Sequence, residues 1–157
     1  MNQENEAKKL RIFTTVNDFQ KEDTNGIITD KRLIGFGRYA GIVGCYNGFR
    51  AFGIKSGLYS IKKAVECENR VELEEEIKKI VLPQNMKIVA TGFGRVGYGA
   101  REIFDLLPLM EVSPEEYLTQ EFEQPIFTHL NVEDYYKRKD GSDFDKNEFY
   151  TNPALFT

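Results

Sequence analysis

The feature that most constrains this sequence is a glycine-rich turn between a β-prone run and a helical pattern. Residues 86–91 (MKIVAT) form a short apolar run that predicts a buried β-strand. The sequence GFGRVG follows at residues 92–97, and apolar side chains then recur at helical spacing up to Pro108. A G-x-G-x-x-G motif alone is weak evidence, but a strand before it and a helix after it are the context that a phosphate-binding turn requires.

Each glycine has a distinct part in such a turn. Gly92 permits the tight bend, Gly94 lets backbone N–H groups reach a pyrophosphate, and Gly97 lets the helix pack closely on the strand. The helix N-terminus, where Arg95 and Val96 lie, adds unpaired N–H donors and a partial positive charge. These residues predict binding of a dinucleotide, NAD or NADP. A tight turn that binds no ligand is the alternative.

The residues after the turn predict two further strands and a helix. A short strand is expected at residues 109–112, then a helix that Ser113 caps and Pro114 opens, then a strand at residues 124–130. We interpret His129, in that last strand, as a packed residue and not a catalyst. The pattern predicts an α/β fold with an incomplete, Rossmann-like parallel sheet and flanking helices.

An acidic residue is expected at the end of the second strand, about 20 residues after the turn, where it would bind the ribose hydroxyls. That place falls at Val112 and Ser113, with Glu111 just before it. Ser113 could bond a ribose hydroxyl or leave room for a 2′-phosphate, so both NAD and NADP remain open.

Four further glycines share one face of an expected helix in the segment from Gly35 to Gly57. They are spaced four, three and four residues apart, at Gly37, Gly41, Gly44 and Gly48. Glycine inside a helix costs up to about 1 kcal/mol against alanine, so the stripe needs a compensating reason. We expect another backbone or a ligand to lie against it, with tight core packing as the simpler reading.

A second helix is predicted after Asn69, which can cap its N-terminus. Its expected apolar stripe consists of Val71, Ile77, Ile80 and Val81, and Pro83 ends it. The intervening glutamates and lysines indicate a solvated face and not a metal site.

Composition limits the classes of function. The 157 residues include two cysteines, which argues against a disulfide scaffold. They include one histidine, which argues against a His-rich metal site and leaves one candidate for the histidine of a catalytic triad. Residues 111–157 hold 11 acidic and 4 basic residues, which argues against a nucleic-acid partner. The sequence contains no run of about 18 apolar residues, so it predicts no membrane helix. Its polar start is not a secretory signal, and we expect a cytoplasmic protein.

The chain divides by composition into two parts. Residues 1–26 form a polar N-terminal segment with a short strand at residues 10–16 and a loop at residues 17–26. Residues 27–157 form the partial dinucleotide-binding domain, and residues 27–36 begin it as an edge strand or an extended entry. The sheet would have an unpaired edge, so we expect homo-oligomers.

Three stretches of the sequence carry a family resemblance. Lys31 to Gly41 resembles the R-[RL]-[IV]-x-F-G-x-[YWF]-A-G stretch of saccharopine dehydrogenases and lysine-ketoglutarate reductase domains. The turn from Gly92 to Ala100 is similar to their G-x-G-R/N-x-x-x-G-A turn, and residues 137–156 resemble a later part of the reductase domain. Alanine dehydrogenase and the transhydrogenase nucleotide-binding domain are wider relatives.

The resemblance implies an NAD(P)-linked oxidoreductase of lysine or amino-acid metabolism, with its active site between two Rossmann-like domains. It implies that Arg32 touches the cofactor, that Phe36 lines the substrate cleft, and that Gly94 and Arg95 meet the pyrophosphate. Ser113 stands where the family has an acidic residue.

The family's catalytic lysine and histidine lie in an N-terminal substrate domain that has no counterpart in this sequence. We therefore assign no catalytic residue, and we expect an internal piece that binds its amino-acid substrate only with the missing domain and is inactive alone. A non-catalytic nucleotide-binding or regulatory module is the alternative function, and an interaction domain without a ligand is a third.

Overall fold

The computed structural model describes residues 19–22, 28–31 and 35–157. The chain forms two compact units, Met1–Phe36 and Gly37–Thr157. In the first unit, β1 (Phe19–Glu22) pairs antiparallel with β2 (Ile28–Lys31), and Phe19 lies opposite Lys31. The loop prediction for residues 17–26 was therefore wrong at β1, which pairs with β2. The strand expected at residues 10–16 lies outside the described residues.

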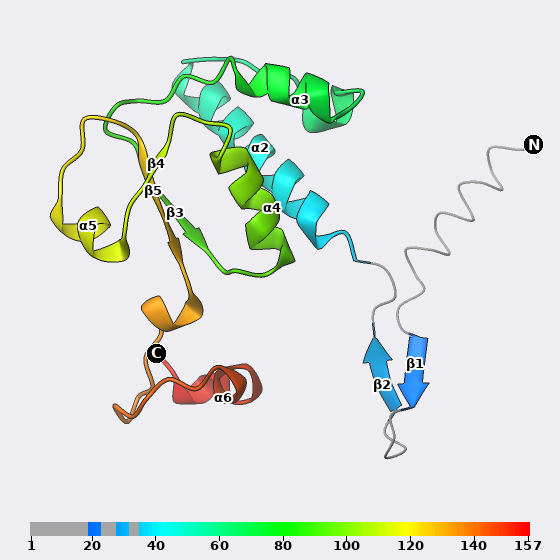
Figure 1. Cartoon of the computed structure of the whole chain (residues 1–157), viewed down its shortest axis with the longest axis vertical. Helices are drawn as coiled ribbons and strands as arrows, with labels where there is room; N and C mark the ends of the chain where they lie inside the picture. The colour runs from blue at the N-terminus through cyan, green and yellow to red at the C-terminus, as the bar shows by residue number, and fades with distance from the viewer. Residues whose placement is uncertain (1–18, 23–27, 32–34) are drawn as a thin grey trace, which may run out of the picture. The chain divides into compact units, whose positions relative to one another are not determined.

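The second unit has a three-stranded parallel sheet with helices on both sides (Figure 1). Its strands are β3 (Lys87–Thr91), β4 (Met110–Glu111) and β5 (Ile126–Leu130), in the order β3-β5-β4. The prediction of an α/β fold with an incomplete Rossmann-like parallel sheet is confirmed. Because β5 lies in the middle, the strand beside β3 is the third of this unit along the chain and not the second.

The burial of the strands follows from their places in the sheet. Four of the five residues of β5 are buried, as expected of a central strand. In β3, exposed and half-buried residues alternate, and Val89 is 46% exposed. The prediction of a buried strand at residues 86–91 was therefore wrong, because β3 is an edge strand in the described part of the chain and one of its faces is open.

Helices α2 (Gly37–Ser56) and α4 (Arg95–Phe104) run side by side against one face of the sheet (Figure 1). Their glycines permit this approach. A Cβ at Gly41 would lie 1.9 Å from the carbonyl oxygen of Val96, and a Cβ at Gly99 would lie 2.0 Å from that of Arg38. Close backbone packing therefore explains the N-terminal half of the glycine stripe. An added Cβ at Gly44 or Gly48 would meet no atom within 4 Å.

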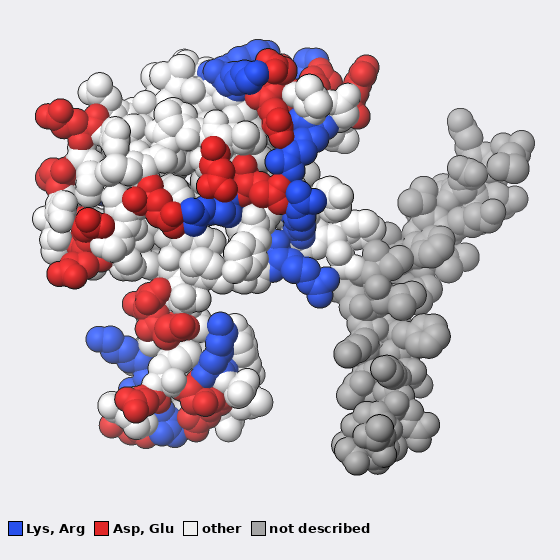
Figure 2. Space-filling view, viewed as in Figure 1, with Lys and Arg blue, Asp and Glu red and all other residues white. Residues whose placement is uncertain are grey.

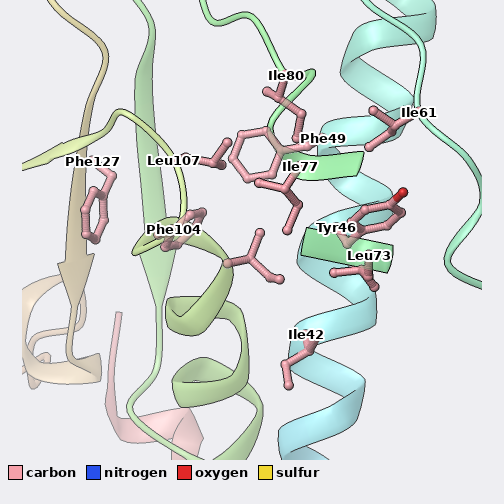
Figure 3. Close-up of a cluster of buried hydrophobic side chains, with 11 residues drawn as sticks. Ile42, Tyr46, Phe49, Ile61, Leu73, Ile77, Ile80, Phe104, Leu107 and Phe127 are labelled. Atoms are coloured by element: carbon pink, nitrogen blue, oxygen red, sulfur yellow. The ribbon is translucent and has the colours of Figure 1, made fainter. Parts of the chain in front are cut away.

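The hydrophobic core joins these two helices to α3 (Arg70–Ile77) and β5 (Figure 3). Phe104 makes an edge-to-face contact with Phe49 at 6.1 Å and also packs on Phe127 at 5.0 Å. Tyr46 is fully buried, and its hydroxyl donates to the carbonyl of Lys62 at 2.7 Å. The largest aromatic side chain of this part of the core is thus both packed and hydrogen-bonded.

Local capping signals were predicted correctly. The Asn69 side chain accepts from the Glu72 N–H at 3.1 Å at the start of α3. Ser113 caps α5 (Pro114–Thr119). The apolar stripe of α3 was only half right: Ile77 and Ile80 are buried, but Val71 and Val81 are exposed. Leu73 is buried instead, on the same face of α3 as Ile77. The helix ends at Ile77, well before the predicted end at Pro83, and Ile80 joins the core from the segment after the helix.

The C-terminal part continues from β5 through a short 3-10 turn, η2 (Val132–Asp134), to α6 (Lys146–Thr151) and η3 (Pro153–Leu155). A further 3-10 turn, η1 (Ala64–Glu66), lies between α2 and α3. Acidic and basic side chains lie next to one another over the helices on the face that Figure 2 shows. Among the residues described, none of the helices has the length and hydropathy to span a bilayer.

Candidate functional site

The glycine turn joins the end of β3 to the start of α4. Gly92 has φ +87°, a conformation that favours glycine, and its N–H donates to the carbonyl of Leu130 at 2.9 Å. Gly94 is the N-cap of α4, with φ −84° and ψ −178°. The turn is therefore bonded to the carboxyl end of β5, the edge of a parallel sheet where ligands bind in open α/β folds.

Gly97 lies where the helix comes closest to the turn. A Cβ at this position would be 1.9 Å from the carbonyl oxygen of Gly92, so no other residue fits without moving the backbone. This is the close approach between helix and turn that the motif predicts for its third glycine.

Gly94 has the opposite environment, because an added Cβ would meet no atom within 4 Å. The N-cap makes no side-chain hydrogen bond to α4, and no acidic residue lies in the first turn. The first N–H groups of a helix have no partner within the helix, so those that include Arg95 and Val96 remain available to an anion. Both side chains are exposed. The five predicted residues of the turn, Gly92, Gly94, Arg95, Val96 and Gly97, are therefore brought together as an anion-binding turn would need.

A hollow of about 410 Å³ opens beside this turn. One wall is the turn itself, and the other comes from the end of β5 and the C-terminal segment. The lining residues are Gly92, Phe93, Gly94, Asn131, Val132, Tyr135, Lys146, Phe149 and Tyr150. The lining therefore combines aromatic rings with one cation and no carboxylate. Sequence reasoning missed residues 131–150, because only the position of β5 beside β3 reveals them.

Ser113 does not lie beside the glycine turn. It follows β4, which is separated from β3 by β5. Its hydroxyl accepts from the Glu116 N–H at 3.2 Å and donates to the Glu116 carboxylate at 2.7 Å. Glu111 likewise binds Arg101, at 2.5 and 2.7 Å. Both side chains therefore act within the local structure around β4.

The two residues assigned from the first unit are not placed at this site. Arg32 lies outside the described residues. Phe36 is the last residue of the first unit and is 65% exposed. Their roles at a cofactor and in a substrate cleft stay predictions.

A second hollow, of about 240 Å³, lies over the C-terminal half of the glycine stripe. It is almost entirely apolar, and Cys45, Gly48, Phe52 and Ile88 are among its lining residues. Burial raises the pKa of the Cys45 thiol to about 12, so this cysteine is not poised as a nucleophile. The hollow explains why Gly48 meets no neighbour.

No family model matches this chain. A comparison with curated proteins finds similarity to alpha-aminoadipic semialdehyde synthase of Arabidopsis thaliana, with 29% identity over an alignment of 160 positions. The alignment covers 80% of this chain and 15% of the length of that protein. The chain is thus similar over most of its length to a small part of a much longer enzyme.

Proposed function

We propose that this chain is the dinucleotide-binding part of an amino-acid dehydrogenase and binds NAD or NADP at the glycine turn. The observation that carries the proposal is the geometry of residues 92–97. Gly92 bends the backbone, Gly97 packs on its carbonyl, and α4 presents a first turn without a side-chain cap. Backbone N–H groups at such a helix start are the usual ligands of a pyrophosphate.

The hollow beside the turn supports a position for the adenosine end of the dinucleotide. In this fold the ribose and base lie at the carboxyl end of the strand beside the glycine turn, and here that strand is β5. Asn131 follows β5 and offers an amide to a ribose hydroxyl, while Tyr135 and Tyr150 offer aromatic surface to a base. Lys146 is a cation in a lining without a carboxylate, which favours the 2′-phosphate of NADP over the free hydroxyls of NAD.

The reaction class rests on the resemblance and on the similarity to alpha-aminoadipic semialdehyde synthase. We propose oxidoreductase chemistry on an amino-acid or saccharopine-type amine. A bound nicotinamide supplies a hydride acceptor or donor. The residues of this chain bind and orient the dinucleotide, and a further part of the enzyme supplies the substrate groups.

One observation bears on the alternative of a non-catalytic binding or regulatory module. The single histidine of the chain is 9% exposed and bonds to the turn, so it is not available to a substrate. This arrangement fits both a module that only binds nucleotide and an enzyme whose proton-transfer groups lie elsewhere.

Calorimetric titration of the purified chain separates these possibilities. We expect saturable binding of NADPH or NADH, weaker binding of ADP, and no binding of nicotinamide mononucleotide at the same concentration. Turnover with a saccharopine-type amine, tested on the chain together with a substrate domain of the same family, would distinguish enzyme from module. A folded chain that binds none of the dinucleotides would overturn the proposal.

A further inference from the structure

His129 lies directly against the glycine turn. Its Nε2 is 2.8 Å from the carbonyl oxygen of Gly92, and the residue is 9% exposed. A carbonyl oxygen only accepts hydrogen bonds, so Nε2 carries the proton and donates it. The register of β5 with β3 brings this about, because His129 pairs with Ala90 two residues before the turn.

The same imidazole stacks on the side chain of the next turn residue. The rings of His129 and Phe93 are 3.9 Å apart and inclined by 16°. Phe93 in turn meets Tyr98 of α4 edge to face, with the ring centroids 6.2 Å apart. One side chain from β5 therefore holds the backbone of Gly92 and the side chain of Phe93 together.

His129 also lies close to the start of the helix. A Cβ at Gly97 would lie 3.5 Å from Nε2, so the imidazole borders the point where turn and helix come closest. The carbonyl that accepts from His129 is also the one on which Gly97 packs. The position of this carbonyl thus sets both the bend at Gly92 and the approach of α4.

His129 is not an ordinary, fully satisfied core histidine. Its Nδ1 is buried and has no hydrogen-bond partner among the described residues. Burial of an unpaired nitrogen is unfavourable, so stability alone is a poor reason for histidine at this position. A phenylalanine would keep the stacking and avoid the unpaired nitrogen, but it would lose the bond to Gly92.

We propose that His129 is a positioning residue of the nucleotide site. Through its N–H bond to Gly92 and its stacking on Phe93, it fixes the turn so that the first N–H groups of α4 converge on one anion. The inference rests on the proposed dinucleotide function. His129 touches no part of the dinucleotide itself and acts through Gly92 and Phe93.

Three variants and a control test the proposal. His129→Phe keeps a planar ring but removes the donor, His129→Gln keeps an N–H near the place of Nε2, and Phe93→Leu removes the stacking. Thr128→Val is the control, because Thr128 is the neighbouring buried residue of β5 and its hydroxyl also has no partner among the residues described. Affinity for NADH and NADPH is measured by calorimetry, and thermal unfolding is measured in parallel.

We expect His129→Phe to weaken dinucleotide binding about tenfold, as loss of one positioned hydrogen bond implies. His129→Gln should recover most of that loss, Phe93→Leu should weaken binding to an intermediate degree, and Thr128→Val should bind as the unaltered chain does. In the unaltered chain, nitrogen-15 spectra should show the proton of His129 on Nε2.

Equal affinity of folded His129→Phe and the unaltered chain would overturn the role of His129 and leave the proposed function intact. Equal loss in the Gln and Phe variants would also overturn it. If His129→Phe does not fold, the Gln variant and the nitrogen spectrum decide, and a proton on Nδ1 alone contradicts the proposal. Absence of binding to the unaltered, folded chain would overturn both proposals.

Discussion

Gly41 and Val96 approach so closely that a Cβ on Gly41 would lie 1.9 Å from the Val96 carbonyl oxygen. This contact joins α2 to the first turn of α4, the part of the helix that follows the glycine turn. The packing of α2 therefore fixes the position of the first turn of α4.

Gly41→Ala should be destabilising, because a methyl group forces the two helices apart. Overpacking of this kind costs about 1–3 kcal/mol in the free energy of unfolding. Gly44→Ala is the matched control in the same helix, since its Cβ would meet nothing within 4 Å. It should stabilise the chain by up to about 1 kcal/mol through helix propensity. Chemical denaturation measures both, and equal effects of the two substitutions would contradict this reading of the stripe.

Gly94→Ala should separate binding from stability. An alanine at this position meets no protein atom within 4 Å and needs no unusual φ, so the unfolding free energy should change little. The methyl group would lie where we place the pyrophosphate, so affinity for NADH and NADPH should fall about tenfold or more. Gly97→Ala is the contrasting variant: its Cβ would lie 1.9 Å from the Gly92 carbonyl, and it should lower the melting temperature. Unchanged affinity in folded Gly94→Ala would remove Gly94 from the site.

Lys146→Gln should reduce affinity for NADPH more than affinity for NADH. Lys146 is the one cation that lines the hollow beside the turn, and a 2′-phosphate gains most from it. Lys137→Gln makes the same change of charge in the same C-terminal segment, outside the lining of the hollow. The quantity to compare between the variants is the ratio of the affinity for NADPH to the affinity for NADH. A ratio that both substitutions alter equally would indicate a general effect of charge and not a contact.

Local signals in the sequence predicted much of this structure. The glycine turn, the caps at Asn69 and Ser113, and the parallel sheet depend on short-range geometry that the residues specify directly. The order of the strands depends on long-range packing. Nothing in residues 109–113 shows that β5 will lie between them and β3. That order places Ser113 away from the glycine turn, while residues of the segment 131–150 line the hollow beside it. The ribose contact that we propose therefore lies at the end of β5 and not at Ser113.

The glycine stripe shows the same limit. Its spacing predicted one face of a helix, and Gly37 and Gly41 do approach α4 there. Spacing could not show that the close backbone approach between α2 and α4 ends before Gly44, since this depends on where β3 and the turn place the shorter helix. Likewise, the apolar run at residues 86–91 could not reveal that Val89 faces outward on an edge strand.

Glu102 should make stability depend on acid pH. Its carboxylate binds Arg38 of α2 at 2.5 and 2.9 Å and Arg70 of α3 at 2.5 Å. These bonds, that of Arg38 first, lower the pKa of Glu102 from 4.5 to about 2. A carboxylate with a lowered pKa contributes stability above its ordinary pKa and loses it as the pH falls toward the folded value.

The unaltered chain should therefore lose stability between pH 4.5 and about 2 through this group. Glu102→Gln should be less stable at pH 7 and should show a smaller loss over the same range. Denaturation at a series of pH values measures both curves. Parallel curves for the two proteins would mean that the ion pairs of Glu102 with Arg38 and Arg70 do not contribute to the dependence of stability on pH.

The most direct test of nucleotide binding at the glycine turn is an amide NMR titration of nitrogen-15-labelled chain with NADPH and NADH. If the first N–H groups of α4 hold the pyrophosphate, saturable shifts should be largest at Gly94–Gly97, with further shifts at Asn131. Saturable shifts that avoid residues 92–97, or a folded spectrum that neither dinucleotide changes, would contradict the assignment.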